Sequence, residues 1–171
     1  YDRRLARSTV VPYLQRIEKM LSGMLVRKPI RLDDVSDLIR EQLFDVDLEG
    51  NDLNIWLYQT ARIVVSFGHC GVLVDAPKEG DKARPYWVTY KPEDILGWRT
   101  EIIEGARELT QVRLLERVVE PDGQYGEKVI SQIRVLERGR YEIHRKDDKK
   151  GEYKLFEEGE MSLKDKIPFA V

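Results

Sequence analysis

The hydrophobic period of this sequence changes once, at Gly71, and that change decides the fold class. Before it, apolar residues in Leu53–Phe67 recur at steps of three and four, which predicts a helix covered on more than one face. After it, residues 72–74 and 86–90 are short runs of β-branched and aromatic residues, which predict strands. Because the helical patterns all precede the strand patterns, we expect an α+β fold.

Two further helices are predicted before Gly71. Residues 10–25 carry one apolar stripe at helical spacing, which is typical of an amphipathic helix. A shorter helix is indicated at residues 35–43 by the spacing of Val35, Leu38 and Ile39. The expected N-terminal caps are Asp33 or Asp34 for this short helix, and Asn51 or Asp52 for the helix that begins at Leu53.

The second half of the chain predicts an antiparallel meander. Strand patterns at residues 109–120, 129–137, 141–145 and 153–156 are separated by turns rich in glycine, aspartate and charged residues. We therefore expect N-terminal helices packed on a mainly antiparallel β-sheet. Residues 1–171 would form a single α+β domain, helical to about residue 70 and β-rich after it.

The composition excludes several classes of protein. The 29 basic and 31 acidic residues give a net charge of -2, so no global positive field would hold nucleic acid. One cysteine and two histidines are too few for a disulfide framework or a structural zinc site. No apolar stretch is long enough to span a membrane, and no signal-peptide pattern opens the sequence. We expect a soluble protein from a reducing compartment.

Three short patterns imitate functional sites, and local structure explains each better. Residues 45–50 begin like a calcium loop, but the twelfth position, which should be a bidentate glutamate, is Trp56. His69 and Cys70 are neighbours at a helix end, where adjacent side chains diverge too far for a base to activate a thiol. Residues 68–71 lack the lysine and hydroxyl of a phosphate-binding loop, so their glycines are expected to end a helix.

One pattern keeps an enzymatic alternative open. Asp122 follows a proline, and Glu152 and Lys154 stand two residues apart, as in metal-dependent nucleases that hold Mg²⁺ between two carboxylates beside a lysine. That chemistry requires the three side chains to converge from neighbouring strands. Asp122 also lies in a Pro-Asp-Gly turn, where aspartate and glycine are expected for conformational reasons alone.

Three segments carry a resemblance to a known family. They are Gly-Met-Leu-Val-Arg-Lys-Pro at residues 23–29, Gly-His-Cys-Gly-Val-Leu-Val-Asp-Ala-Pro at 68–77, and Arg-Pro-Tyr-Trp-Val-Thr-Tyr-Lys-Pro-Glu-Asp-Ile-Leu-Gly-Trp-Arg at 84–99. With the helices around them, they resemble tailed-bacteriophage portal proteins, in particular a branch known as an uncharacterised phage domain. The signature positions are Gly23, Arg27, Pro29, Gly68, Gly71, Asp75, Pro85, Pro92, Asp94 and Trp98.

The resemblance implies a structural role and no catalytic residue, metal or cofactor. Portal proteins form a ring, typically a dodecamer, at one capsid vertex of the virion, and they assemble in the cytoplasm of the host bacterium. Double-stranded DNA passes through the ring without sequence-specific binding, and terminase, capsid and tail adaptor proteins dock on it. A portal-like adaptor with no channel role is a second alternative to the portal, beside the nuclease.

The resemblance also implies which part of a portal this chain would be. The sequence opens with Tyr1, and its last residues, 166–171, look like the beginning of a strand. We therefore expect a fragment of a longer chain. It would correspond to the wing region, with the family's stem helices and clip following Val171.

Overall fold

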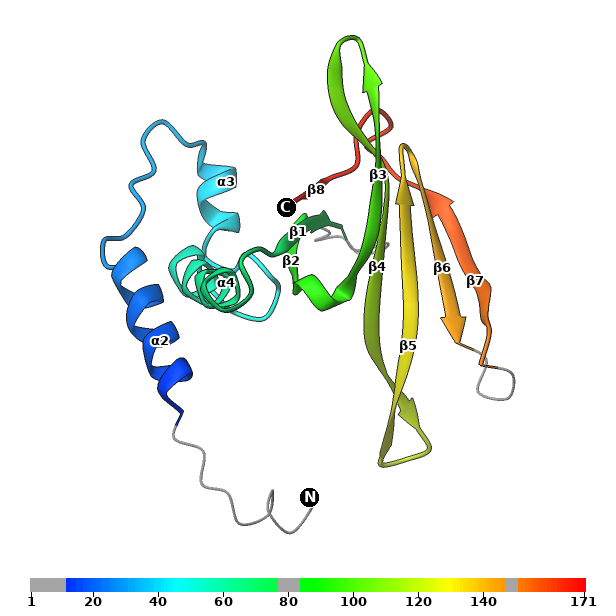
Figure 1. Cartoon of the computed structure of the whole chain (residues 1–171), viewed down its shortest axis with the longest axis horizontal. Helices are drawn as coiled ribbons and strands as arrows, with labels where there is room; N and C mark the ends of the chain where they lie inside the picture. Colours follow the sequence, from blue (N-terminus) through cyan, green and yellow to red (C-terminus); the bar gives the residue numbers. More distant parts are fainter. Residues whose placement is uncertain (1–11, 77–83, 147–150) are drawn as a thin grey trace. The chain divides into compact units, whose positions relative to one another are not determined.

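The structure, a computed structural model, describes residues 12–76, 84–146 and 151–171 (Figure 1). The chain divides into two compact units, residues 1–69 and 70–171, which we describe separately. The predicted α+β class is confirmed, because helices come first and two antiparallel sheets of three and five strands follow. Among the described residues, no helix has the length and apolarity needed to cross a membrane.

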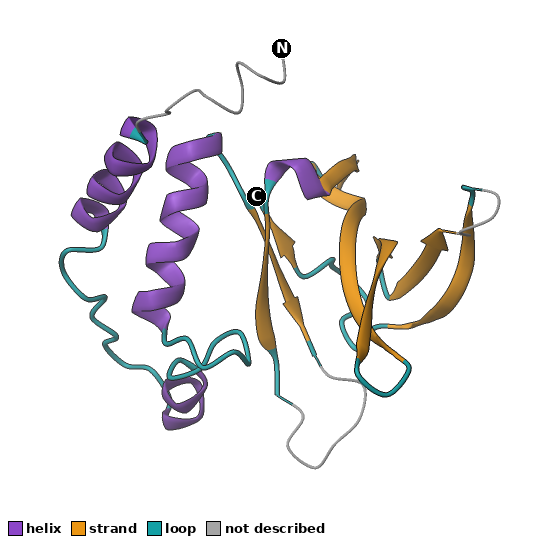
Figure 2. Cartoon of the chain, turned by 90° about the horizontal axis from the view of Figure 1, so that it is seen from below, coloured by secondary structure: helices purple, strands orange, loops and turns teal. Residues whose placement is uncertain are grey.

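The first unit contains three helices: α2 (Tyr13–Leu25), α3 (Asp37–Gln42) and α4 (Leu53–Phe67). Helices α2 and α4 lie side by side (Figure 2), and Arg62 Nε on α4 lies 2.5 Å from Glu18 Oε1 on α2. The predicted bounds of α4 are confirmed, and Asp52 caps it by accepting a 2.8 Å hydrogen bond from the Ile55 amide. The predicted cap of α3 is wrong, because Ser36 Oγ takes that role in place of Asp33 or Asp34.

Burial in this unit differs from the sequence prediction. We predicted that α4 would be covered on more than one face, yet none of its residues is fully buried. The large apolar side chains of α2 are also exposed, for example 74% at Leu14. In the described part of the unit, Val46 is the one buried apolar side chain. Periodicity shows which face of a helix is apolar, but it does not show how much of that face a neighbour covers.

The second unit is built from two antiparallel sheets (Figure 1). The smaller sheet has the order β2-β1-β8, and the larger one the order β3-β4-β5-β6-β7. A 3₁₀ turn, η1 (Pro92–Asp94), connects β2 in one sheet to β3 in the other. The strands are β1 (Gly71–Asp75), β2 (Tyr86–Tyr90), β3 (Ile95–Ile103), β4 (Ala106–Asp122), β5 (Gly126–Glu137), β6 (Arg140–Lys146), β7 (Tyr153–Glu160) and β8 (Phe169–Ala170).

Strand β3 is the element that sequence patterns missed. Its pairing with β4 shifts register between Ile95 and Gly97 and again between Arg99 and Thr100. Each shift interrupts the alternation of apolar and polar residues by which a strand is recognised. Gly97 adopts a φ of +148°, a conformation that L side chains rarely adopt, and the Arg113 guanidinium lies over it.

The core of the second unit lies between its two sheets. The smaller sheet supplies Leu73 and Tyr90, and the larger sheet supplies Val112, Leu114 and Leu136, all nearly or fully buried. Ile167, from the segment between β7 and β8, joins this core, with Phe169 packed against it. The ring of Phe169 meets that of Tyr90 edge to face, with 6.2 Å between centroids.

Candidate functional site

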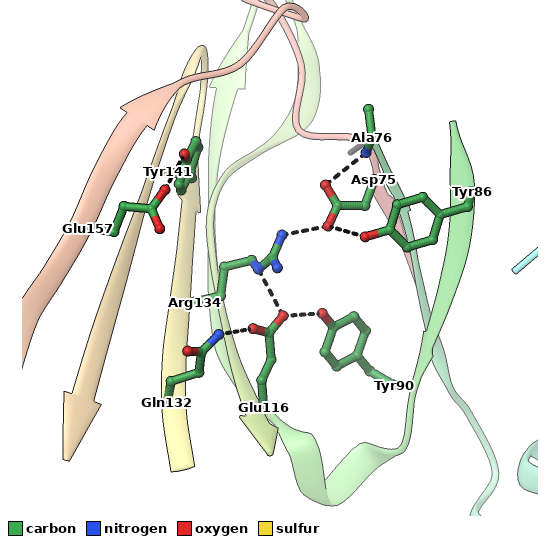
Figure 3. Close-up of polar contacts among 9 residues, drawn as sticks. All are labelled: Asp75, Ala76, Tyr86, Tyr90, Glu116, Gln132, Arg134, Tyr141 and Glu157. Atoms are coloured by element: carbon green, nitrogen blue, oxygen red, sulfur yellow. Dashed lines mark hydrogen bonds and ion pairs between the residues drawn. The ribbon is translucent and has the colours of Figure 1, made fainter. Parts of the chain in front are cut away.

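A polar cluster lies between the two sheets, next to the core (Figure 3). We call it the inter-sheet cluster; it consists of Asp75, Tyr86, Tyr90, Glu116, Gln132 and Arg134. Arg134 on β5 donates from Nη1 to Asp75 Oδ2 on β1 at 2.7 Å, and its Nε lies 2.8 Å from Glu116 Oε1 on β4. One guanidinium therefore bridges carboxylates from both sheets.

The remaining members of the cluster complete the bonding of its two carboxylates. The Tyr90 hydroxyl donates to Glu116 Oε1 at 2.6 Å, and the Gln132 amide donates to Glu116 Oε2 at 2.7 Å. The Tyr86 hydroxyl donates to Asp75 Oδ2 at 3.3 Å. Charged and polar groups in a partly buried site are costly unless they are paired, and here each carboxylate has several donors.

The surroundings of Arg134 and Tyr90 keep these two side chains in their ordinary charge states. Burial alone would lower the pKa of Arg134, but the charges of Glu116 and Asp75 outweigh burial and raise that pKa. Burial, followed by the charge of Glu116, raises the pKa of Tyr90 well above its usual range. Arg134 therefore stays cationic and Tyr90 stays neutral, so neither is prepared to exchange a proton near neutral pH.

The arrangement suits a structural connection better than a reaction. The two best-formed hollows in the described part of the protein are small, about 180 and 220 Å³, and no member of the cluster lines either one. Among the described residues, no group of three histidine, cysteine, aspartate or glutamate side chains is placed to hold a metal ion. What the cluster can do chemically is join β1 and β2 to β4 and β5.

Several predicted signature residues lie in the second unit, in or beside β1, β2, η1 and β3. Asp75 ends β1 and belongs to the inter-sheet cluster. Pro85 precedes β2, and Pro92 is the first residue of η1, where a fixed φ favours the turn. Asp94 Oδ1 accepts a 3.0 Å hydrogen bond from Arg117, and Trp98 on β3 is 53% exposed.

The two glycines of the predicted helix end have different structural reasons. Gly68 follows α4 in the left-handed conformation, with φ of +89°, and its amide donates to the Val64 carbonyl. Gly71 has no special φ; instead, a Cβ there would lie 2.3 Å from Cζ of Phe169 and 3.0 Å from Cδ1 of Ile95. The prediction that Gly68 ends the helix is confirmed, and Gly71 is needed for close packing in the second unit.

The remaining signature residues belong to the first unit. Gly23 lies inside α2, and no atom comes within 4 Å of the position that its Cβ would take. Arg27 and Pro29 follow the end of α2 and are exposed. None of these three positions shows a close contact that would require its residue type.

The structure does not bring the predicted nuclease residues together. Asp122 ends β4 at the tip of the β4–β5 hairpin, whereas Lys154 lies on β7 and Glu152 just before it. Lys154 on β7 lies level with Glu116 on β4, as the strand pairing through the intervening β6 and β5 shows. Asp122 lies six residues beyond Glu116, which is about 20 Å along the strand. These groups therefore do not share a metal site in this arrangement.

The other imitations of functional sites also have local explanations. In the acidic loop at residues 45–50, Asp45 Oδ1 accepts a 2.9 Å hydrogen bond from the Gly50 amide. Asp47 Oδ1 accepts a 3.0 Å hydrogen bond from the Glu49 amide. Cys70 is buried, and this burial raises the pKa of its thiol, which disfavours the reactive thiolate. The carboxylates bond to their own loop, and the cysteine behaves as a small apolar residue.

Sequence reasoning missed most of the inter-sheet cluster. Of the cluster's members, Asp75 alone was a predicted site residue, because it is one of the signature positions. A weak signal was present, because the polar residues Gln132 and Arg134 alternate with Ile133 and Val135 in a strand pattern. The structure turns Gln132 and Arg134 inward together with Leu136, since they pair with Glu116, Leu114 and Val112. An arginine on the covered face of a strand needs a carboxylate partner there.

Comparison with known proteins adds no assignment. No family model matches the sequence, and no curated protein matches it significantly.

Proposed function

We propose that this chain is a structural subunit of a tailed-phage portal ring at the capsid vertex. The ring would form the conduit through which DNA is packaged and ejected, and on which terminase, capsid and tail adaptor proteins dock. The observation that carries this proposal is the resemblance of residues 23–29, 68–77 and 84–99 to portal proteins. The proposal places the protein in the virion, assembled in the host cytoplasm.

The positions of the signature residues support a structural rather than a catalytic role. Gly68 ends a helix, Gly71 allows the Phe169 ring to approach the backbone, and Pro92 begins the turn between two sheets. Each of these roles depends on backbone conformation or packing. None supplies a nucleophile, a general base or a metal ligand.

The charge distribution of the second unit supports passage of DNA without tight binding. Arg134 is held by two carboxylates, and Arg117, Arg138 and Arg145 pair with Asp94, Glu108 and Glu120 respectively. Cations that are already paired release little energy by replacing counterions on a phosphate backbone. A conduit that held DNA phosphates tightly would slow the DNA that passes through it.

Immunogold labelling of intact phage particles tests the proposal. Antibodies raised against this chain are expected to label a single vertex, at the junction of head and tail, once the tail is removed. A capsid protein labelled in the same way serves as the control and should mark the whole head. Labelling spread over the head, or particles without the protein, would contradict the proposal.

A further inference from the structure

The helical unit exposes two apolar surfaces of opposite charge. We call the first the α2 surface; it consists of residues 12–32, which include helix α2. We call the second the α3 surface; it consists of residues 33–52, which include helix α3 and the acidic loop before α4. Both belong to the same compact unit of residues 1–69.

The α2 surface is apolar and basic. Residues 12–32 contain five cations, Arg16, Lys19, Arg27, Lys28 and Arg31, and a single acid, Glu18, which pairs with Arg62. The large apolar side chains of α2 are between 40% and 74% exposed; they are Tyr13, Leu14, Ile17, Met20, Leu21, Met24 and Leu25. The buried side chain of α2 is Ser22, so contact with α4 leaves the apolar stripe uncovered.

The α3 surface is apolar and acidic. Residues 33–52 contain eight acids and one cation, Arg40. Leu38 and Phe44 are 68% and 71% exposed, and Ile39 and Leu48 are each nearly half exposed. Phe44 lies two residues after the end of α3, between the acids Glu41 and Asp45.

Exposed apolar surface on this scale indicates an interaction site. Soluble proteins rarely leave so many large apolar side chains uncovered on one small unit. Because both surfaces are exposed in the same unit, neither covers the other within one copy. Their opposite charges make them complementary, whereas contact between two α2 surfaces would bring cations together.

We infer that the α2 surface of one copy docks on the α3 surface of a second copy of this chain. Such a contact joins two different patches, so it is heterologous and leaves one free patch of each kind on every pair. Repetition of the contact closes a ring or extends a filament. The inference rests on the proposed function, because a ring requires a contact between neighbouring subunits and this docking would supply that contact.

Cysteine cross-linking between two differently labelled copies tests the inference. One copy carries Met20→Cys on the α2 surface, and the other carries Phe44→Cys on the α3 surface. Both positions are exposed, at 60% and 71%, so neither substitution disturbs a core. The native Cys70 is buried and stays in place, and the unchanged chain measures its background. In the matched control, the first copy carries Tyr125→Cys in place of Met20→Cys. The Tyr125 side chain lies on the second unit and is 91% exposed.

The mixture of Met20→Cys and Phe44→Cys copies is expected to give at least threefold more disulfide-linked dimer than either copy alone or the control pair. Adding Arg16→Glu and Lys19→Glu to the first copy should reduce the yield, and Glu41→Lys on the second should restore it. A yield no higher than the control, or equal dimerisation of Met20→Cys alone, would overturn the inference. If rings are seen by electron microscopy while cross-linking fails, this inference is wrong but the ring proposal is not. If neither rings nor cross-linked dimers are found, the inference and the ring proposal are both wrong.

Discussion

Arg134 on β5 and Asp75 on β1 are separated by 59 residues in the sequence, and their Nη1 and Oδ2 atoms lie 2.7 Å apart. The same guanidinium also pairs with Glu116 on β4. Because β1 belongs to the smaller sheet and β4 and β5 to the larger one, this arginine connects the two sheets of the second unit. Its removal should therefore affect the packing of the whole unit.

Arg134→Ala is expected to destabilise the protein by about 3 kcal/mol, the lower end of the cost of breaking a buried ion pair. The reason is that Asp75 and Glu116, with side chains only 22% and 13% exposed, would lose their cation. Urea unfolding followed by circular dichroism measures the change. Arg140→Ala is the control, since that side chain is 60% exposed and its loss should leave the midpoint unchanged. Equal losses in the two variants would contradict the role of Arg134.

Tyr90→Phe is expected to cost about 1 kcal/mol at neutral pH, because Glu116 loses a hydrogen-bond donor. Since folding raises the pKa of Tyr90, its contribution is fully present below the ordinary tyrosine pKa of about 10 and is lost as pH rises above it. The difference in the free energy of unfolding between the parent and Tyr90→Phe should therefore be smaller at about pH 11 than at about pH 7. Urea titrations at both pH values measure the gap.

Tyr125→Phe is the control for that experiment, because the Tyr125 side chain is 91% exposed. It should unfold like the parent at neutral pH. A gap between parent and Tyr90→Phe that stays constant, or widens, at alkaline pH would show that the Tyr90 hydroxyl is not held neutral by the fold.

Gly71→Val is expected to lower stability by about 3 kcal/mol, since overpacking a close contact forces neighbouring groups to move. The added Cβ would lie 2.3 Å from the ring of Phe169, which is packed against the core. Gly23→Ala is the comparison, because its Cβ would meet no atom and alanine favours a helix over glycine by about 1 kcal/mol. Thermal melting of both variants measures the difference, and a Gly71→Val chain that melts like the parent would refute the packing account.

Because Asp122 and Lys154 lie far apart, we predict that they do not form a nuclease site. Supercoiled plasmid incubated with the protein and Mg²⁺ or Mn²⁺ should remain intact on an agarose gel. Cleavage that disappears in both Asp122→Ala and Glu152→Ala would establish the nuclease alternative in place of the portal. Cleavage that persists in both variants would identify a contaminating enzyme.

Local signals in the sequence were sufficient to predict several elements. The bounds of α4 follow from a capping aspartate at Asp52 and a glycine at Gly68, each of which acts on its immediate neighbours. The predicted cap of α3 was wrong because Ser36, and neither Asp33 nor Asp34, is placed to bond the Ile39 amide. Strand β3 was missed because its two register shifts remove the alternation.

The inter-sheet cluster could not be predicted, because its members meet only through long-range pairing. Gln132 reaches Glu116 through the register of β4 with β5, and Arg134 reaches Asp75 only when the two sheets pack together. A change of register by one residue would turn Arg134 to the opposite face. The amphipathic pattern of α2 likewise predicted an apolar face correctly but not its exposure.

Electron microscopy of the purified full-length protein tests the central proposal most directly. Negatively stained particles should be rings with an open central channel, and class averages should show rotational symmetry close to that of a dodecamer. Monomers, two-fold dimers or particles without a channel, at concentrations where the protein is folded, would contradict the proposal that this chain is a portal subunit.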